Sequence, residues 1–182
     1  ALIEEWPGVY LQESFQRAYV YPELLSHVIG YTSFVSENDL TEDPSYAIDD
    51  IKGMSGAELM FEKNLRGIKG RKDVQVNSLG KEDKILDYAQ SQKGEDLVLT
   101  IDLPLQRELS AIMQLHMEKV NAKRGAAIVL DPSNGEILAL ISLPAFDNNL
   151  FTTSFNSDEY AKLISDQNKP LFNRAISGEY PP

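Results

Sequence analysis

The segment from residue 125 to residue 147 constrains the fold most, because it predicts a buried hairpin. Residues 126–130 and 137–141 are continuous apolar runs, the pattern of strands that are covered on both faces. The sequence Asp131-Pro132-Ser133-Asn134-Gly135 between them suits a bulged hairpin turn, in which proline presets φ and glycine supplies a positive φ. Two strands without a polar face need layers on both sides, so the rest of the chain must supply helices to cover them.

The composition excludes several kinds of partner and site. The 182 residues carry a formal net charge of −11, which argues against binding duplex nucleic acid or an anionic membrane, since both need clustered Lys and Arg. The absence of cysteine excludes disulfides and thiolate metal sites. No apolar run reaches the roughly 20 residues of a membrane helix, and no basic and apolar leader is visible. We therefore expect the chain as given to be soluble and to be a piece of something longer.

The first part of the chain predicts short strands and helices. We expect, in order, a strand over residues 8–13, a short helix over 24–31 ended by Gly30, a strand over 31–35, and an exposed acidic loop over 36–51 with room for one helical turn. Ser55 and Glu58 have the spacing of a capping box and predict a helix that ends at Arg66 and Gly67. Its buried face would consist of Ala57, Met60, Phe61 and Leu65.

The middle of the chain leads into the hairpin. Alternation over residues 73–77 predicts a strand that turns at 78–80 and returns within 81–94, and residues 97–101 predict another strand. Asp102 can cap a helix of roughly five turns that packs onto the hairpin through Leu105, Leu109, Ile112, Met113, Met117 and Val120. A last short helix is expected over 156–164. Together these elements predict an α+β fold.

The residues that could hold a metal or cofactor are scattered. His27 and His116 are far apart, and we expect His116, near the apolar face of the long helix, to be a hydrogen-bonded structural histidine. The acid pairs Glu42-Asp43 and Asp49-Asp50 are explained by a solvated loop. Neither a phosphate loop, for which we considered Gly53, Gly56, Gly67 and Gly70, nor a calcium loop at Asp131 to Glu136 has the required pattern. The sequence thus predicts no metal and no cofactor.

One fragment has the letters of an acylating serine. Enzymes of the penicillin-recognising type need Ser-x-x-Lys, with both side chains one helical turn apart, and Ser78-Leu79-Gly80-Lys81 fits. It lies in a polar turn rather than at the start of a helix, which favours a hairpin turn over a nucleophile. Ser-x-Asn occurs at Ser36-Glu37-Asn38 and at Ser154-Phe155-Asn156, whereas Lys-Ser/Thr-Gly does not occur.

The order of several motifs resembles the class B penicillin-binding proteins over nearly the whole chain. The motifs are Tyr21-Pro22, His27-Val28-Ile29-Gly30-Tyr31, Gly53-Met54-Ser55-Gly56-Ala57-Glu58, Leu65-Arg66-Gly67, Leu97-Val98-Leu99-Thr100-Ile101-Asp102, Asp131-Pro132-Ser133-Asn134-Gly135-Glu136-Ile137-Leu138-Ala139, Lys169-Pro170-Leu171-Phe172-Asn173-Arg174-Ala175-Ile176 and Tyr180-Pro181-Pro182. The ending is closer to the elongation type, the penicillin-binding protein 2 group, than to the division type.

The resemblance implies a division into two parts. Residues 1–95 would form a β-rich pedestal, also called the dimerisation domain, and residues 96–182 the first helix and hairpin of a mixed α/β transpeptidase domain that is incomplete. In that family Tyr-Pro-Pro is followed by Gly-Ser-x-x-Lys. The resemblance therefore implies that this chain holds no catalytic residue, with Ser-x-x-Lys, Ser-x-Asn and Lys-Thr-Gly expected beyond Pro182.

The activity that the resemblance implies belongs to a longer parent, a serine-type D,D-transpeptidase of peptidoglycan. Its serine would attack the penultimate D-Ala carbonyl of a stem peptide, and an amine would then take the acyl group. β-Lactams would acylate the same serine. The parent would lie at the extracytoplasmic face of the bacterial cell membrane, with an anchor before Ala1, and this fragment alone would be inactive.

A second hypothesis belongs to a different functional class. In it, this portion is a non-catalytic interaction or regulatory module, whose pedestal docks cell-wall elongation proteins. The exposed acidic loop over residues 36–51 would be the docking surface. The two hypotheses are compatible, because a pedestal can serve an enzyme.

Overall fold

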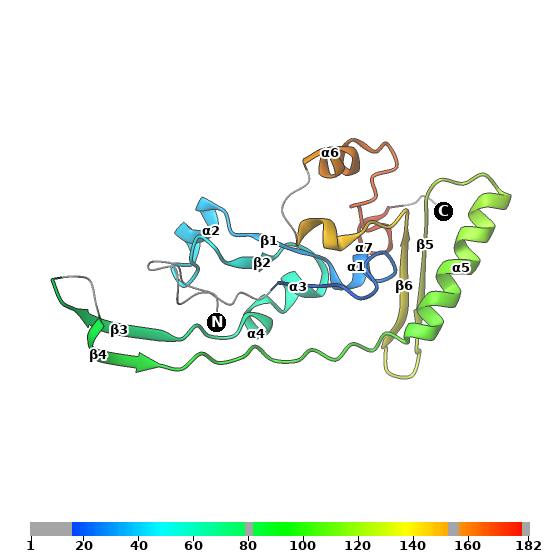
Figure 1. Cartoon of the computed structure of the whole chain (residues 1–182). Coiled ribbons are helices and arrows are strands. Elements are labelled where there is room, and N and C mark those ends of the chain that lie inside the picture. The colour runs from blue at the N-terminus through cyan, green and yellow to red at the C-terminus, as the bar shows by residue number, and fades with distance from the viewer. Residues whose placement is uncertain (1–15, 79–81, 153–156, 180–182) are drawn as a thin grey trace, which may run out of the picture.

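A computed structural model describes residues 16–78, 82–152 and 157–179 (Figure 1). The strand expected over residues 8–13, together with Leu79 to Lys81 and Thr153 to Asn156, lies outside these residues. The elements in order are α1 (Ser26–Ile29), β1 (Thr32–Phe34), α2 (Glu37–Glu42), β2 (Ile51–Gly53), α3 (Gly56–Met60), α4 (Glu62–Arg66), β3 (Arg71–Val76), β4 (Glu82–Ala89), α5 (Leu103–Lys119), β5 (Gly125–Leu130), β6 (Ile137–Leu143), η2 (Asn148–Phe151), α6 (Ser157–Ser165) and α7 (Arg174–Ser177).

The strands of the described residues form three separate antiparallel pairs, β1–β2, β3–β4 and β5–β6, which confirms the α+β class. The β3–β4 ribbon projects from one end of the molecule, whereas α5 and the β5–β6 hairpin form the opposite end (Figure 1). Residues 90–101 connect these ends without a helix or a regular strand. In the described part of the chain, no helix combines the length and apolar character that a membrane span needs.

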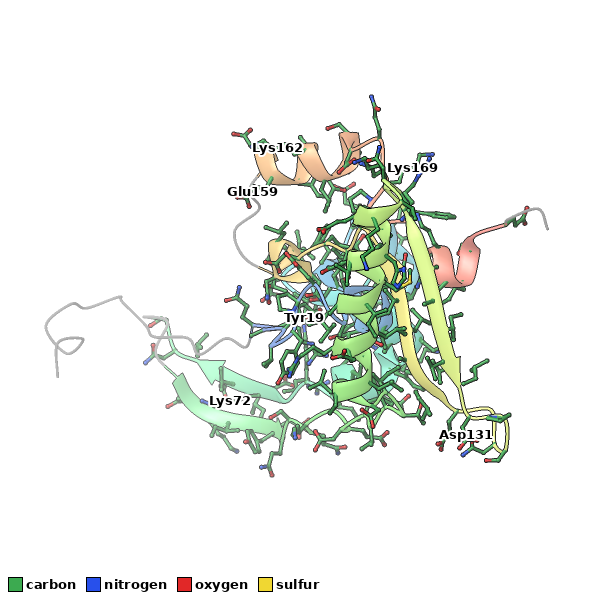
Figure 2. All side chains as sticks on the ribbon, turned by 90° about the vertical axis from the view of Figure 1, so that its right-hand side faces the viewer. Tyr19, Lys72, Asp131, Glu159, Lys162 and Lys169 are labelled. Atoms are coloured by element: carbon green, nitrogen blue, oxygen red, sulfur yellow. The ribbon has the colours of Figure 1, made fainter. Side chains whose placement is uncertain are left out.

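The hairpin from β5 to β6 forms as expected. Gly125 pairs with Leu143 at one end and Leu130 with Ile137 at the other, with a bulge at Val129/Leu130. The turn is closed by Asp131, whose carbonyl accepts from Gly135 N at 2.8 Å and whose amide donates to Glu136 O at 2.9 Å. Figure 2 shows this turn pointing away from the rest of the molecule, with α5 lying along the hairpin.

The expected covering of both strands holds for only one of them. The interior of β6 is buried, with Ala139 at 0% and Ile141 at 3% exposure, because β6 contacts α5, α1 and α7. On β5, Ile128 is 44% and Leu130 is 55% exposed. Besides β6, the main contacts of β5 among the described residues are with α5 and α7, so the prediction of a strand covered on both faces is wrong for β5.

The long helix begins where expected, since the Asp102 side chain accepts a hydrogen bond from Leu105 N at 2.9 Å. Of the six apolar residues expected on its packing face, Leu105, Leu109, Met113 and Met117 are half-buried. Ile112 and Val120 are 45% and 71% exposed, so the packing face of the helix contains fewer residues than expected. The predicted strand over residues 97–101 is also wrong. This stretch reaches the free edge of β6 only at its end, where Thr100 Oγ1 donates to Ile137 O at 2.8 Å.

The β1–β2 pair and the helices α2, α3 and α4 form what we call the outer lobe (residues 32–66). The helix predicted from Ser55 starts there but breaks at Phe61 into α3 and α4, and its expected packing face is not buried, since Met60 is 77% exposed. The capping box is wrong as well, because Ser55 makes no side-chain cap. A capping box occurs instead at Ser36, which accepts from Asp39 N and begins α2.

The outer lobe joins the rest of the molecule where two stretches of backbone cross. Gly30 has φ +81°, and a Cβ built on it would lie 1.9 Å from the Ser55 carbonyl oxygen. On the other side of the crossing, a Cβ on Gly56 would lie 2.7 Å from the Ile29 carbonyl oxygen. The two stretches can approach so closely only because neither residue carries a side chain.

We expect Gly30→Ala to lower the free energy of unfolding by about 3 kcal/mol or more, since it combines a left-handed φ with a backbone clash. Gly135→Ala is the matched control: Gly135 has a similar φ of +80° but nothing within 4 Å of its Cβ position. That change should cost only about 1 kcal/mol. Urea unfolding of both variants measures the difference, and equal losses would contradict a close crossing at Gly30.

Candidate functional site

The described residues bring no Ser-Lys pair together at the predicted acylating fragment. Ser78 is exposed in the turn that follows β3, and Lys81 lies outside the described residues. Ser36 of the first Ser-x-Asn match is engaged by Asp39, to which its hydroxyl donates at 2.7 Å. Ser154 and Asn156 of the second match lie outside the described residues as well. Among the described residues the predicted letters therefore form no nucleophilic site.

The two histidines lie in different environments. His27 is 9% exposed and packs edge to face against Phe146, with ring centroids 5.2 Å apart. Burial lowers the pKa of His27, which favours the neutral ring. His116 is exposed on α5, so the expectation of a structural histidine near the packing face is wrong. Within the described residues, no group of three His, Cys, Asp or Glu side chains is placed to hold a metal ion.

The acidic loop of residues 36–51 is less solvated than expected. Three of its carboxylates pair with cations that follow it in sequence: Asp39 with Lys52 at 2.5 Å, Asp43 with Arg66 at 3.5 Å, and Asp50 with Lys69 at 2.5 Å. The hydrogen bond from the Lys52 ammonium, together with those from Ser36, holds the pKa of the Asp39 carboxyl below its usual range. All four residues of the two acid pairs were expected to be solvated, but only Glu42 and Asp49 are exposed, whereas Asp43 and Asp50 are half-buried.

The structure instead assembles a polar junction around residues 17–31, which we call the junction segment. Its centre is Gln106 of α5, with 0% exposure. The Gln106 amide donates to Leu24 O at 2.9 Å and to Leu140 O at 2.8 Å, and its oxygen accepts from Leu140 N at 2.8 Å. The side chain thus takes the place of a third strand at the free edge of β6 and joins that edge to the junction segment.

Three asparagines add to this contact between the junction segment and the second half of the chain. Asn148 donates to Gly30 O at 2.8 Å, and Asn173 donates to His27 O at 3.1 Å. Asn149 accepts from Tyr19 N at 2.8 Å and donates to Tyr19 O at 3.0 Å. The sequence patterns assigned no tertiary role to any of these residues, although Asn173 belongs to one of the motifs that carry the resemblance. A detectable sign was Gln106 itself, a polar residue on the same helical face as Leu109 and Met113.

The Asn-Arg motif near residue 174 has a definite structural task. Arg174 is 4% exposed, and its guanidinium donates to the carbonyls of Lys169 and Phe172, each at 3.2 Å, and to that of Asn168. Its backbone amide donates to Ser142 Oγ at 3.0 Å. The motif therefore folds residues 168–174 into a turn that is fixed against β6, immediately before α7.

The junction segment also contacts the outer lobe through a buried carboxylate. Glu58 of α3 is 5% exposed and receives two contacts from Arg17, at 2.7 Å from Nε and at 2.8 Å from Nη2. The Tyr19 hydroxyl donates to the same carboxylate at 3.4 Å, and burial raises the pKa of Tyr19 to about 12. Glu58, expected to cap its own helix, is thus used for a tertiary ion pair.

We expect Glu58→Gln to lower the free energy of unfolding by about 2 kcal/mol, because it leaves Arg17 without a counter-charge. The loss stays below the usual range for a buried pair, since Arg17 keeps 38% of its side-chain exposure. Asp96→Asn is the control, because its pair with Lys93 is 85% and 82% exposed and should contribute no measurable stability. Chemical unfolding at pH 7 compares them, and a neutral Glu58→Gln variant would contradict the assigned role.

Comparison with known proteins confirms the resemblance. The family model of the penicillin-binding protein dimerisation domain matches residues 2–99. "Peptidoglycan D,D-transpeptidase MrdA" of Escherichia coli K12 is 37% identical over 97% of this chain, and the protein of that name from Haemophilus influenzae is 34% identical over 98%. The chain spans only 28% and 27% of the length of these two relatives.

Solved structures agree with this match. One is the complex of penicillin-binding protein PBP2 and MreC from Helicobacter pylori. The alignment covers 95% of this chain and 31% of the solved chain, with a TM-score of 0.80 and 32% identity. PBP2 of Pseudomonas aeruginosa in complex with WCK 5153 aligns with 91% of this chain and 32% of that one, with a TM-score of 0.67 and 31% identity. The chain therefore belongs to the penicillin-binding protein dimerisation-domain family, as the amino-terminal region of a class B protein of the PBP2/MrdA type.

Proposed function

We propose that the chain is the non-catalytic part of a peptidoglycan D,D-transpeptidase, with a pedestal in residues 1–95 and the start of the transpeptidase domain in residues 96–182. One observation carries this proposal. Of this chain, 97% to 98% aligns with 27% to 28% of the length of relatives whose names state this activity. The family model ends at residue 99, inside the irregular connection of residues 90–101, which supports a boundary in that region.

In this proposal the acylated serine lies outside residues 1–182. The serine hydroxyl attacks the D-Ala carbonyl of a stem peptide, the terminal D-Ala leaves as the amine, and the acyl group passes to an amine acceptor. The residues of this chain position that site without touching the substrate. Arg174 and Asn173 fix the turn before α7, and Gln106 anchors α5 and the edge of β6.

Labelling with a fluorescent penicillin tests the proposal. We expect the 182-residue chain to show no covalent label under conditions that label a longer protein of this family. The Ser78→Ala variant is the control for adventitious acylation. A label on the chain that disappears in Ser78→Ala would contradict the proposal, because it would place a nucleophile within these residues.

A second function is supported by the apolar surface of the outer lobe. Phe34, Ile48 and Met60 of the outer lobe are 65%, 80% and 77% exposed, and exposed apolar side chains that form a patch mark sites of protein–protein interaction. A PBP2 of the same fold has been solved in complex with MreC. We therefore include docking of a cell-wall elongation protein, on the extracytoplasmic side of the membrane, in the proposed function.

Point substitutions test docking better than deletion of residues 36–51, because deletion would also break the ion pairs of Asp39, Asp43 and Asp50. We expect Ile48→Ser to weaken binding to an MreC-type partner by about tenfold, the loss that is typical when a side chain that contributes strongly to an interface is truncated. Ile85→Ser on β4, where Ile85 is 54% exposed, is the matched control and should leave binding unchanged. Equal affinities, measured by surface plasmon resonance, would count against the acidic loop as the docking surface.

A further inference from the structure

The junction segment precedes the outer lobe in sequence, yet its backbone is held by the other half of the chain. Five hydrogen bonds join the side chains of Gln106, Asn148, Asn149 and Asn173 to backbone groups of residues 19–30, four donated by these side chains and one accepted by Asn149 from Tyr19 N. We call these four side chains the amide bracket. Gln106 is fully buried and both ends of its amide are hydrogen-bonded, so moving the segment away would leave a buried N–H of Gln106 without a partner, which is costly. Asn148 is also fully buried and donates to Gly30 O, whereas its own Oδ1 has no hydrogen-bond partner among the described residues.

Aromatic side chains of the junction segment also pack against the second half of the chain. The ring of Tyr31 stacks on Phe151 with centroids 3.9 Å apart, and His27 lies edge to face against Phe146. Tyr19, at the start of the segment, is 8% exposed and lies in the interior of the molecule (Figure 2). The segment is therefore joined to residues 102–177, which we call the body, by both polar and aromatic contacts.

The outer lobe has a much thinner core. Its strands β1 and β2 are three residues long each, and α2 has no buried residue. The lobe contacts the junction segment at a few points, which include the Arg17–Glu58 pair, the crossing of Gly30 with Gly56, and the hydrogen bond from Met54 N to Tyr31 O at 2.8 Å. Regions with little buried apolar surface open at lower free energy than the parts around them.

We propose that the junction segment and the body form one cooperative unit, and that the outer lobe is a second, less stable unit attached through the segment. The mechanical boundary then lies near Tyr31 and not only at residues 95 and 96. A partner that displaces the outer lobe acts on the edge of β6 through the amide bracket, in addition to the covalent connection of residues 90–101.

Native-state hydrogen exchange on the 182-residue chain, at increasing denaturant below the unfolding transition, tests the proposal without any substitution. The amides of Ile29 and Gly30 report on the segment, those of Gln106 and Leu140 on the body, and that of Val35, bonded to Asp50 O, on the outer lobe. As denaturant increases, we expect the opening free energies of the Ile29 and Gly30 amides to merge with those of Gln106 and Leu140, which indicates one shared opening. The Val35 amide should exchange through an opening of lower free energy. If the opening free energies of Ile29 and Gly30 merge with that of Val35 instead, the proposal is overturned.

A matched pair of variants tests the bracket itself. Gln106→Met keeps the volume of the side chain but removes its hydrogen bonds, whereas Gln114→Met changes an exposed position two turns later on α5. We expect Gln106→Met to accelerate exchange at Ile29 and Gly30 by about tenfold or more, with Val35 unchanged, and Gln114→Met to have no effect. An acceleration confined to Leu140 and its neighbours on β6 would show that the bracket does not hold the segment, and would overturn the proposal.

Discussion

The buried amide of Gln106 is the interaction on which the arrangement of this molecule depends. It satisfies both backbone groups of Leu140 at the free edge of β6 and also holds Leu24 of the junction segment. An unpaired strand edge inside a protein leaves polar groups without partners, which is costly. One side chain of α5 removes that cost and, in the same geometry, fixes where the amino-terminal part of the chain lies.

The attachment of the outer lobe follows from this anchor. Once residues 19–30 are held against the body, the Gly30–Gly56 crossing and the Arg17–Glu58 pair determine where β1, β2 and α3 can be. The lobe then presents large apolar side chains and several acidic residues at a distance from the hairpin.

Several local predictions from the sequence are wrong for one shared reason. Ser55 and Glu58 have the spacing of a capping box, but Glu58 forms a buried pair with Arg17, which lies 41 residues earlier. Residues 97–101 have strand composition, but only their end meets a partner edge. Asp43 and Asp50 look solvated in sequence, yet Arg66 and Lys69 pair with them. In each case contacts distant in sequence decided the outcome, by their presence at Glu58, Asp43 and Asp50 and by the lack of a partner edge along most of residues 97–101.

The sequence by itself determined the elements whose energetics are local: the hairpin with its Asp131 to Gly135 turn, the Asp102 cap of α5, and the end of α1 at Gly30. Its ordered motifs also determined the family. Only the tertiary structure decided which residues hold the parts together. Gln106, Asn148, Asn149 and Arg17 bind groups that lie 34 to 130 residues away in the sequence, and no periodicity or turn rule encodes such partners.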